Sequence, residues 1–104
     1  MSLKDLQADV DKWTSQFTPQ YWAPHEILAR LIEETGELAR EINHLYGPKK
    51  KKISEETREL ADEISDIFFT LGCLANSKGI DLDDAWKRMI EKYTLRDNER
   101  FSKK

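Results

Sequence analysis

The sequence predicts an all-α protein, a four-helix up-and-down bundle that we expect oligomerisation to complete. Apolar residues recur at the three- and four-residue spacing of a helix face in four separate segments. Short breaks that contain proline or glycine separate most of these segments. No segment alternates apolar and polar residues as a half-buried strand does. Helices of this length joined by short loops favour an up-and-down bundle.

The first helix is predicted over residues 3–17. Ser2 is suited to cap its start, because a serine side chain accepts from the free N–H groups of a first turn. We expect Trp13 and Phe17 to pack in the core. The apolar residues of this segment form one seam, which comprises Leu3, Leu6, Val10, Trp13 and Phe17. The chain then breaks around Thr18-Pro19-Gln20.

The second helix is predicted over residues 24–46. Pro24 suits a first helical turn, where its missing N–H costs nothing. Gly47-Pro48 ends the helix. Its apolar stripe consists of Ile27, Leu31, Leu38, Ile42 and Leu45.

Two more helices follow a basic linker at residues 49–52. Ser54 is expected to cap the third helix, which Gly79 ends. Its stripe consists of Leu60, Ile64, Ile67, Leu71 and Leu74. Asp81 is expected to cap the fourth helix. The apolar positions of that helix are Ala85, Trp86, Met89, Ile90 and Tyr93.

Carboxylates flank the apolar stripes of the second and third helices. Glu33, Glu34 and Glu37 lie beside the first of these stripes, and Glu63 and Asp66 beside the other. Packing two such helices together partly desolvates their acids, and unpaired charges there are costly. Either cluster alone is typical of a solvated, charged helix edge. The two together favour a site for a hard cation such as Mg²⁺, which prefers carboxylate and phosphate oxygens.

The motif Glu33-Glu34-x-x-Glu37, followed by Glu63-x-x-Asp66, resembles the MazG-like nucleotide pyrophosphohydrolases of the all-α NTP pyrophosphatase superfamily. Residues 31–39 resemble the second helix of that family, and residues 59–67 resemble its third helix. The resemblance extends over roughly residues 3–101. We therefore expect residues 1–104 to form a single domain of this kind.

The resemblance implies a Mg²⁺-dependent enzyme that cleaves a nucleoside triphosphate, ribo or deoxy, to the monophosphate and pyrophosphate. It implies that Glu34, Glu37, Glu63 and Asp66 hold Mg²⁺, with Mn²⁺ as a substitute. Glu33 would then orient or deprotonate the attacking water. Two biological roles stay open: house-cleaning of damaged nucleotides and control of ordinary nucleotide pools.

Two further groups are candidates for substrate contacts. Lys92, Arg96 and Arg100 follow one another at four-residue spacing and resemble the basic C-terminal segment of the family, which implies a phosphate clamp. Trp22 lies just before the acidic helix, where a nucleobase stacks as readily as a core side chain packs.

The composition of the chain limits the classes of binding partner that we expect. A net charge of −3 provides no basic field for a nucleic acid polymer. No apolar run approaches the roughly 18 residues of a membrane span, so we expect no membrane partner. The single Cys73 has no partner for an internal disulfide, which fits a reducing cytoplasm, and we expect it to be partly buried.

A homodimer or homotetramer is expected because one short bundle cannot bury all the apolar residues. Phe68 and Phe69 point about 100° apart on a helix, and Leu28 and Ile32 lie off the main stripe. The alternative to an enzyme is a helical partner-binding module with an acidic face. A di-iron bundle is disfavoured, since it needs two Glu-x-x-His units and only Glu41-Ile42-Asn43-His44 fits.

Overall fold

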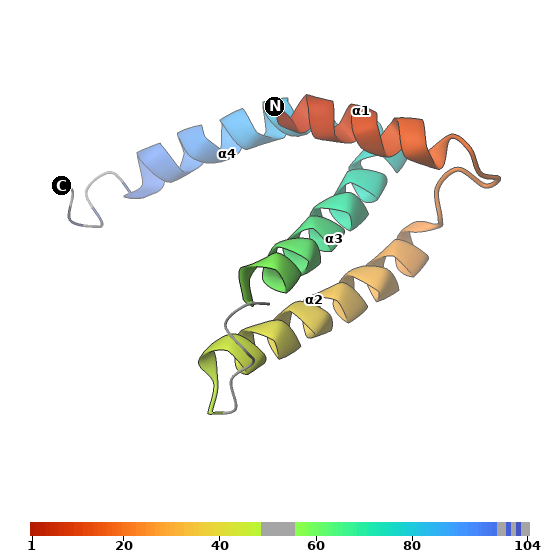
Figure 1. Cartoon of the computed structure of the whole chain (residues 1–104). Coiled ribbons are helices and arrows are strands. Elements are labelled where there is room, and N and C mark those ends of the chain that lie inside the picture. The colour runs from red at the N-terminus through yellow and green to blue at the C-terminus, as the bar shows by residue number, and fades with distance from the viewer. Residues whose placement is uncertain (49–55, 98–99, 101, 103–104) are drawn as a thin grey trace.

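The computed structural model of the chain consists of helices with short connections. They are α1 (Leu3–Thr14), α2 (Pro24–Tyr46), α3 (Glu56–Ser77) and α4 (Leu82–Asp97). The structure describes residues 1–48, 56–97, 100 and 102, and these include no strand. The helices α2 and α3 lie antiparallel and side by side, while α1 crosses the C-terminal part of α3 (Figure 1). The predicted all-α class is confirmed, and the described residues form the four expected helices.

The helix starts follow the capping chemistry read from the sequence. The Ser2 hydroxyl accepts from the Asp5 N–H, and the Asp5 carboxylate accepts from the Ser2 N–H. Pro24 is the first residue of α2. The Asp81 carboxylate accepts from two N–H groups at the start of α4. The predicted Ser54 cap and the basic linker at residues 49–52 lie outside the described residues.

The first helix is shorter than predicted, and its aromatic end is not core. It ends at Thr14, whose hydroxyl donates to the Val10 carbonyl, and the chain turns before Pro19. Phe17 therefore lies beyond α1. Trp13 and Phe17 are 55% and 51% exposed, so the expectation that they are buried was wrong for a single chain. Their rings instead contact each other, with centroids 5.0 Å apart.

A glycine allows α1 to approach α3 closely. A Cβ atom added to Gly72 would lie only 3.0 Å from Val10 Cγ2 and 3.2 Å from Leu6 Cδ2. Cys73, on the same turn, is partly buried as expected, and burial raises the pKa of its thiol. The contact between α1 and α3 thus stabilises the C-terminal end of α3. This end of α3 lies nearest to the loop that connects α1 to α2 (Figure 1).

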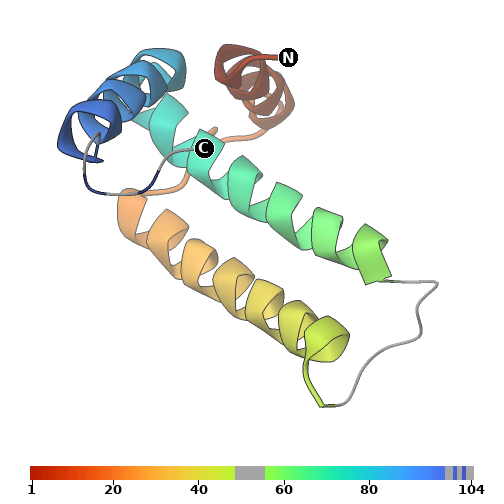
Figure 2. The same ribbon diagram turned by 90° about the vertical axis from the view of Figure 1, so that its left-hand side faces the viewer.

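One chain does not close the bundle. The fourth helix begins beside the first residues of α1, and most of its length extends away from α2 and α3 (Figures 1 and 2). The radius of gyration is 17.1 Å, whereas a compact domain of 100 residues has about 13 Å. Leu28, Ile32, Phe68 and Phe69 are all exposed on the single chain, as the sequence led us to expect. Within the described ranges, no helix is long and apolar enough to cross a membrane.

Candidate active site

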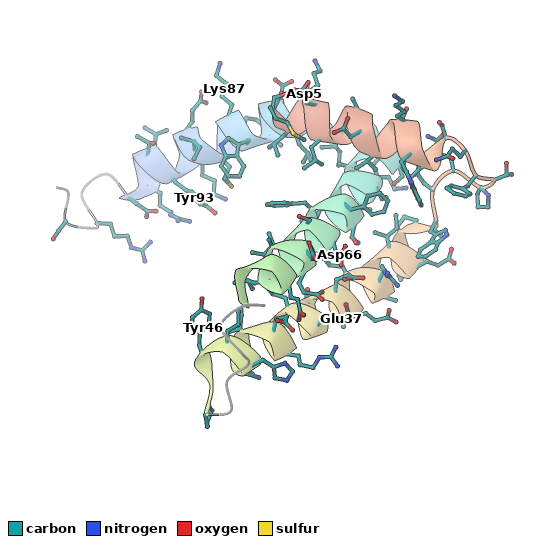
Figure 3. All side chains as sticks on the ribbon, viewed as in Figure 1. Asp5, Glu37, Tyr46, Asp66, Lys87 and Tyr93 are labelled. Carbon is teal, nitrogen blue, oxygen red and sulfur yellow. The ribbon has the colours of Figure 1, made fainter. Side chains whose placement is uncertain are left out.

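Four carboxylates converge between α2 and α3. Glu34 and Glu37 come from α2, and Glu63 and Asp66 come from α3. Each pair is three residues apart, which puts both of its members on one face of the helix. Figure 3 shows Glu37 and Asp66 at the level where the two helices face each other. One oxygen from each of the four side chains lies within 4.8 Å of the others, a spacing at which a single cation contacts several of them.

Burial leaves this acid cluster electrostatically unsatisfied. Glu34 is only 2% exposed. Its Oε2 atom and the Oε2 atom of Glu63 are buried, and neither has a hydrogen-bond partner among the described residues. Desolvation raises the pKa of both carboxyls, and the neighbouring acids raise it further. Buried, unpaired carboxylate oxygens with no histidine or cysteine in the set are the donors that a hard divalent cation requires.

Arg30 lies next to this cluster. Its Nε atom is 2.9 Å from Glu34 Oε1, and its Nη1 atom is 3.8 Å from Glu33 Oε2. The pair with Arg30 lowers the pKa of Glu34, but this effect is smaller than the increase caused by desolvation. The Glu33 side chain is 66% exposed and does not belong to the converging set. The structure thus places Glu33 at the edge of the acid cluster, on its solvent side.

An aromatic pocket of about 500 Å³ adjoins the acids. Glu34 and Asp66 form part of its wall, so the pocket and the acid cluster are continuous. Its aromatic lining comprises Trp13, Phe17, Tyr21, Trp22 and Phe69. Trp22 is 54% exposed, which leaves its ring available to a ligand. A flat apolar group bound in this pocket would lie within reach of the carboxylates.

A hydrogen-bond network holds the loop that forms one wall of this pocket. The Tyr21 hydroxyl donates to Asp11 Oδ1 at 2.8 Å and accepts from Asn76 Nδ2 at 3.0 Å. The Asn76 side chain also donates to the Gln7 carbonyl and accepts from the Gln7 amide. Gln20 donates to Asp11 as well. The network ties the loop to both α1 and α3, and burial raises the pKa of Tyr21.

Comparison with known proteins assigns the family. Residues 23–101 match the model of the MazG nucleotide pyrophosphohydrolase domain. This chain belongs to the MazG family. It thereby falls among enzymes that hydrolyse phosphoanhydride bonds of nucleotides, and the resemblance predicted from the two acid motifs is confirmed.

Relatives of this MazG domain extend over nearly its full length. The protein YpjD of Bacillus subtilis (strain 168) is 47% identical over 99% of this chain and 93% of its own length. The crystal structure of YpjD covers 89% of this chain and 95% of that one, with a TM-score of 0.81. A Bacillus-conserved MazG protein, described as a nucleotide pyrophosphohydrolase, has a TM-score of 0.77 at 42% identity. It covers 89% of this chain and 90% of that chain.

The basic residues predicted on the last helix of this MazG chain do not reach the acids of the same chain. Figure 3 shows Lys87 and Tyr93, which mark α4, well away from Glu37 and Asp66. Arg96 forms two hydrogen bonds to Asp97 and lies over the Tyr93 ring. Arg100 was expected on this helix but lies beyond its end at Asp97, and its Nη1 atom is 3.5 Å from Asp97 Oδ1. Neither they nor Lys92 line the aromatic pocket.

Sequence reasoning missed Arg30 and the Tyr21–Asn76 contact. Arg30 precedes Glu34 by four residues on a predicted helix, and that spacing was a usable signal for an ion pair. The Tyr21–Asn76 contact joins residues 55 apart in the chain, and a single sequence carries no signal for it. The His44 Nδ1 atom lies 3.9 Å from Glu41 Oε1, and neither residue is part of the four-acid set found among the described residues.

The raised pKa values predict an unusual pH dependence of stability for the metal-free MazG domain. The unfolded carboxyls titrate near their ordinary value of 4.5, and the folded ones titrate above it. Between these values the folded state binds more protons, so the free energy of unfolding should fall as pH rises through that window. Denaturant unfolding of wild type and a Glu34→Gln, Glu63→Gln double variant with chelator tests this. The difference in stability between the two should shrink towards pH 4, and a difference independent of pH would contradict the prediction.

Proposed function

We propose that this chain is a Mg²⁺-dependent nucleoside triphosphate pyrophosphohydrolase, which cleaves between the α- and β-phosphates to give a monophosphate and pyrophosphate. The observation that carries the proposal is the acid cluster itself. Two of its carboxylate oxygens are buried without a hydrogen-bond partner among the described residues, and two of its acids, Glu34 and Asp66, line an aromatic pocket in a chain of the MazG family. The pocket is suited to bind a nucleobase. The acid cluster is suited to bind a metal ion that also contacts the phosphates of the same nucleotide.

Mg²⁺ would be held by Glu34, Glu37, Glu63 and Asp66, with Mn²⁺ as a substitute. When bound, such an ion supplies Lewis acidity toward phosphate oxygens and the attacking water. The residues fit because the set contains only carboxylates and because two of their buried oxygens have no hydrogen-bond donor among the described residues. Glu33 lies one residue before Glu34 and is exposed, so its carboxylate would accept a proton from a water that enters from solvent.

Trp22 would stack on the nucleobase. Trp22→Ala should raise KM roughly 5- to 150-fold, which corresponds to the 1–3 kcal/mol of one base–aromatic stack, and should leave Mg²⁺ affinity unchanged. Initial rates over a range of triphosphate concentrations measure the effect. Tyr46→Ala is the control, since Tyr46 is an exposed aromatic residue at the end of α2 that does not line the pocket. Equal KM values for wild type and Trp22→Ala would remove Trp22 from the base site.

In a homo-oligomer, either a dimer or a tetramer, α4 would be able to contact the substrate of a neighbouring subunit. Lys92, Arg96 and Arg100 cannot clamp phosphates at the acid cluster of their own chain as it is folded here. The extension of α4 away from α2 and α3 leaves it free to reach a neighbouring chain (Figure 1). We therefore assign the phosphate clamp to the site of a neighbouring subunit.

A screen of nucleoside triphosphates tests the function directly. Purified protein is incubated with each ribo- and deoxynucleoside triphosphate, with Mg²⁺, with Mn²⁺ or with chelator, and pyrophosphate is measured. Pyrophosphate and the matching monophosphate should appear in equal amounts, and only with metal. Release of inorganic phosphate in place of pyrophosphate would mean that the cleaved bond is not the one between the α- and β-phosphates, and would contradict the proposal. No product from any triphosphate would favour the non-enzymatic, partner-binding alternative.

A further inference from the structure

Arg30 occupies the boundary between the aromatic pocket and the acid cluster. Its side chain lines the pocket together with Trp22, and its guanidinium contacts Glu34, which belongs to the cluster. The side chain is 53% exposed, so it is accessible from the pocket. A ligand that fills the pocket and also contacts Glu34 therefore lies close to this guanidinium.

The charges at this boundary are strongly unbalanced. Glu33 and the four converging carboxylates surround the region. Arg30 is the only cationic side chain among the described residues that line the pocket. A nucleotide would bring further negative charge to the same place. A fixed cation at the point where the phosphates leave the nucleoside would reduce that repulsion.

The guanidinium has hydrogen-bond donors to spare for a ligand. Its short contact with Glu34 runs through Nε. The 3.8 Å separation between Nη1 and Glu33 Oε2 is too long for a hydrogen bond. Among the described residues, the end of the guanidinium formed by Nη1 and Nη2 is therefore available to a ligand. That end presents parallel N–H groups, the arrangement that pairs with two oxygens of a phosphate.

We propose that Arg30 binds the phosphate nearest the nucleoside, while its Nε keeps Glu34 oriented toward the acid cluster. This proposal rests on the proposed function and deepens it. It assigns the α-phosphate to a residue of the same chain that holds the base and the metal. The proposed α4 clamp then serves the distal phosphates from a neighbouring chain. One nucleotide would contact three elements in order: the aromatic loop, Arg30 and the carboxylates.

Binding of products separates a phosphate contact from other roles of Arg30. The four deoxynucleoside monophosphates and the matching deoxynucleosides are titrated by calorimetry into wild type, Arg30→Ala and Arg30→Lys, with Mg²⁺ present. Mg²⁺ alone is titrated in parallel. Arg30→Ala should weaken monophosphate binding about 10- to 100-fold, the value of a charged hydrogen-bonded contact. It should change deoxynucleoside affinity less than about twofold. Mg²⁺ affinity should change less than monophosphate affinity, since the loss of the Glu34 contact acts on the metal only indirectly. Arg30→Lys keeps the charge but not the paired donors and should recover part of the loss.

Arg40→Ala is the matched control, because Arg40 is an exposed arginine of α2 that lines neither the pocket nor the acid cluster. Its monophosphate affinity should equal that of wild type. Thermal unfolding confirms that each variant folds.

Three results would overturn the inference. If Arg30→Ala weakened monophosphate and deoxynucleoside binding equally, Arg30 would contact the base and not the phosphate. A larger change in Mg²⁺ affinity than in monophosphate affinity would make it a partner of Glu34 alone. Unchanged monophosphate binding would remove it from the site. If wild type releases pyrophosphate and Arg30→Ala still binds monophosphate normally, only this inference fails. If wild type hydrolyses no triphosphate, the proposed function itself fails.

Discussion

The Glu63→Gln variant is expected to lose at least about 100-fold in triphosphate hydrolysis while its metal-free form becomes more stable. Residues that hydrogen-bond to the ligands of a metal typically contribute 10–100-fold to metal affinity or activity, and a ligand itself should contribute no less. Stability should rise because Glu63 has a buried, unpartnered oxygen and three acidic neighbours that raise its pKa. Glutamine removes the charge and keeps the volume. Each kcal/mol of relieved repulsion corresponds to about 4–8 °C in Tm for a domain of this size.

Glu63 is a sharper test than Glu34, because Glu34→Gln would also remove the ion pair with Arg30. Thermal unfolding with and without Mg²⁺ provides the measurement. Mg²⁺ should raise the Tm of wild type by stabilising the folded state, and it should raise that of Glu63→Gln much less. Asp62→Asn is the matched control, since Asp62 is an exposed acid of α3 outside the converging set. Wild-type turnover together with a wild-type Mg²⁺ shift in Glu63→Gln would remove Glu63 from the metal site.

The Phe68→Glu variant is expected to dissociate the wild-type assembly or to prevent its folding. Phe68 is 51% exposed and lines a second, largely apolar pocket between α1 and α3, together with Leu6, Val10 and Trp13. Exposed apolar surface of this extent on one chain is typical of a subunit interface, and a two-fold dimer is its commonest form. Phe69 is less suitable for the test, because it also packs on Trp13 in the aromatic pocket.

Sedimentation at micromolar concentration measures the assembly. Wild type should sediment as at least a dimer of the 12.2 kDa chain, and Tyr46→Glu, at an exposed position near the end of α2, should match it. A folded wild-type monomer would contradict the prediction. The α4 clamp is tested by mixing Glu63→Gln chains with Arg96→Ala chains. Each is expected to be impaired alone, and the mixture should recover activity only if α4 acts on a neighbouring site.

The acid cluster was predictable because helical periodicity is local. Spacings of three and four residues place Glu34 with Glu37, and Glu63 with Asp66, whatever the helices pack against. The neighbouring stripes then require the two acidic edges to lie near the same interface. The same locality explains the correct caps at Ser2 and Asp81. It fails at Phe17, where the apolar spacing continues past the end of α1 although the chain has already turned.

The sequence by itself determined the all-α class, the four helices, the family and the residues of the acid cluster. These features depend on periodicity, capping and short motifs, which operate within a few turns of one helix. Only the tertiary structure showed the aromatic pocket beside the acids, the position of Arg30 between them, and the separation of α4 from the site of its own chain. Such features depend on contacts between distant segments, as Tyr21 with Asn76 illustrates. Those contacts follow from how whole helices pack, and no local pattern encodes them.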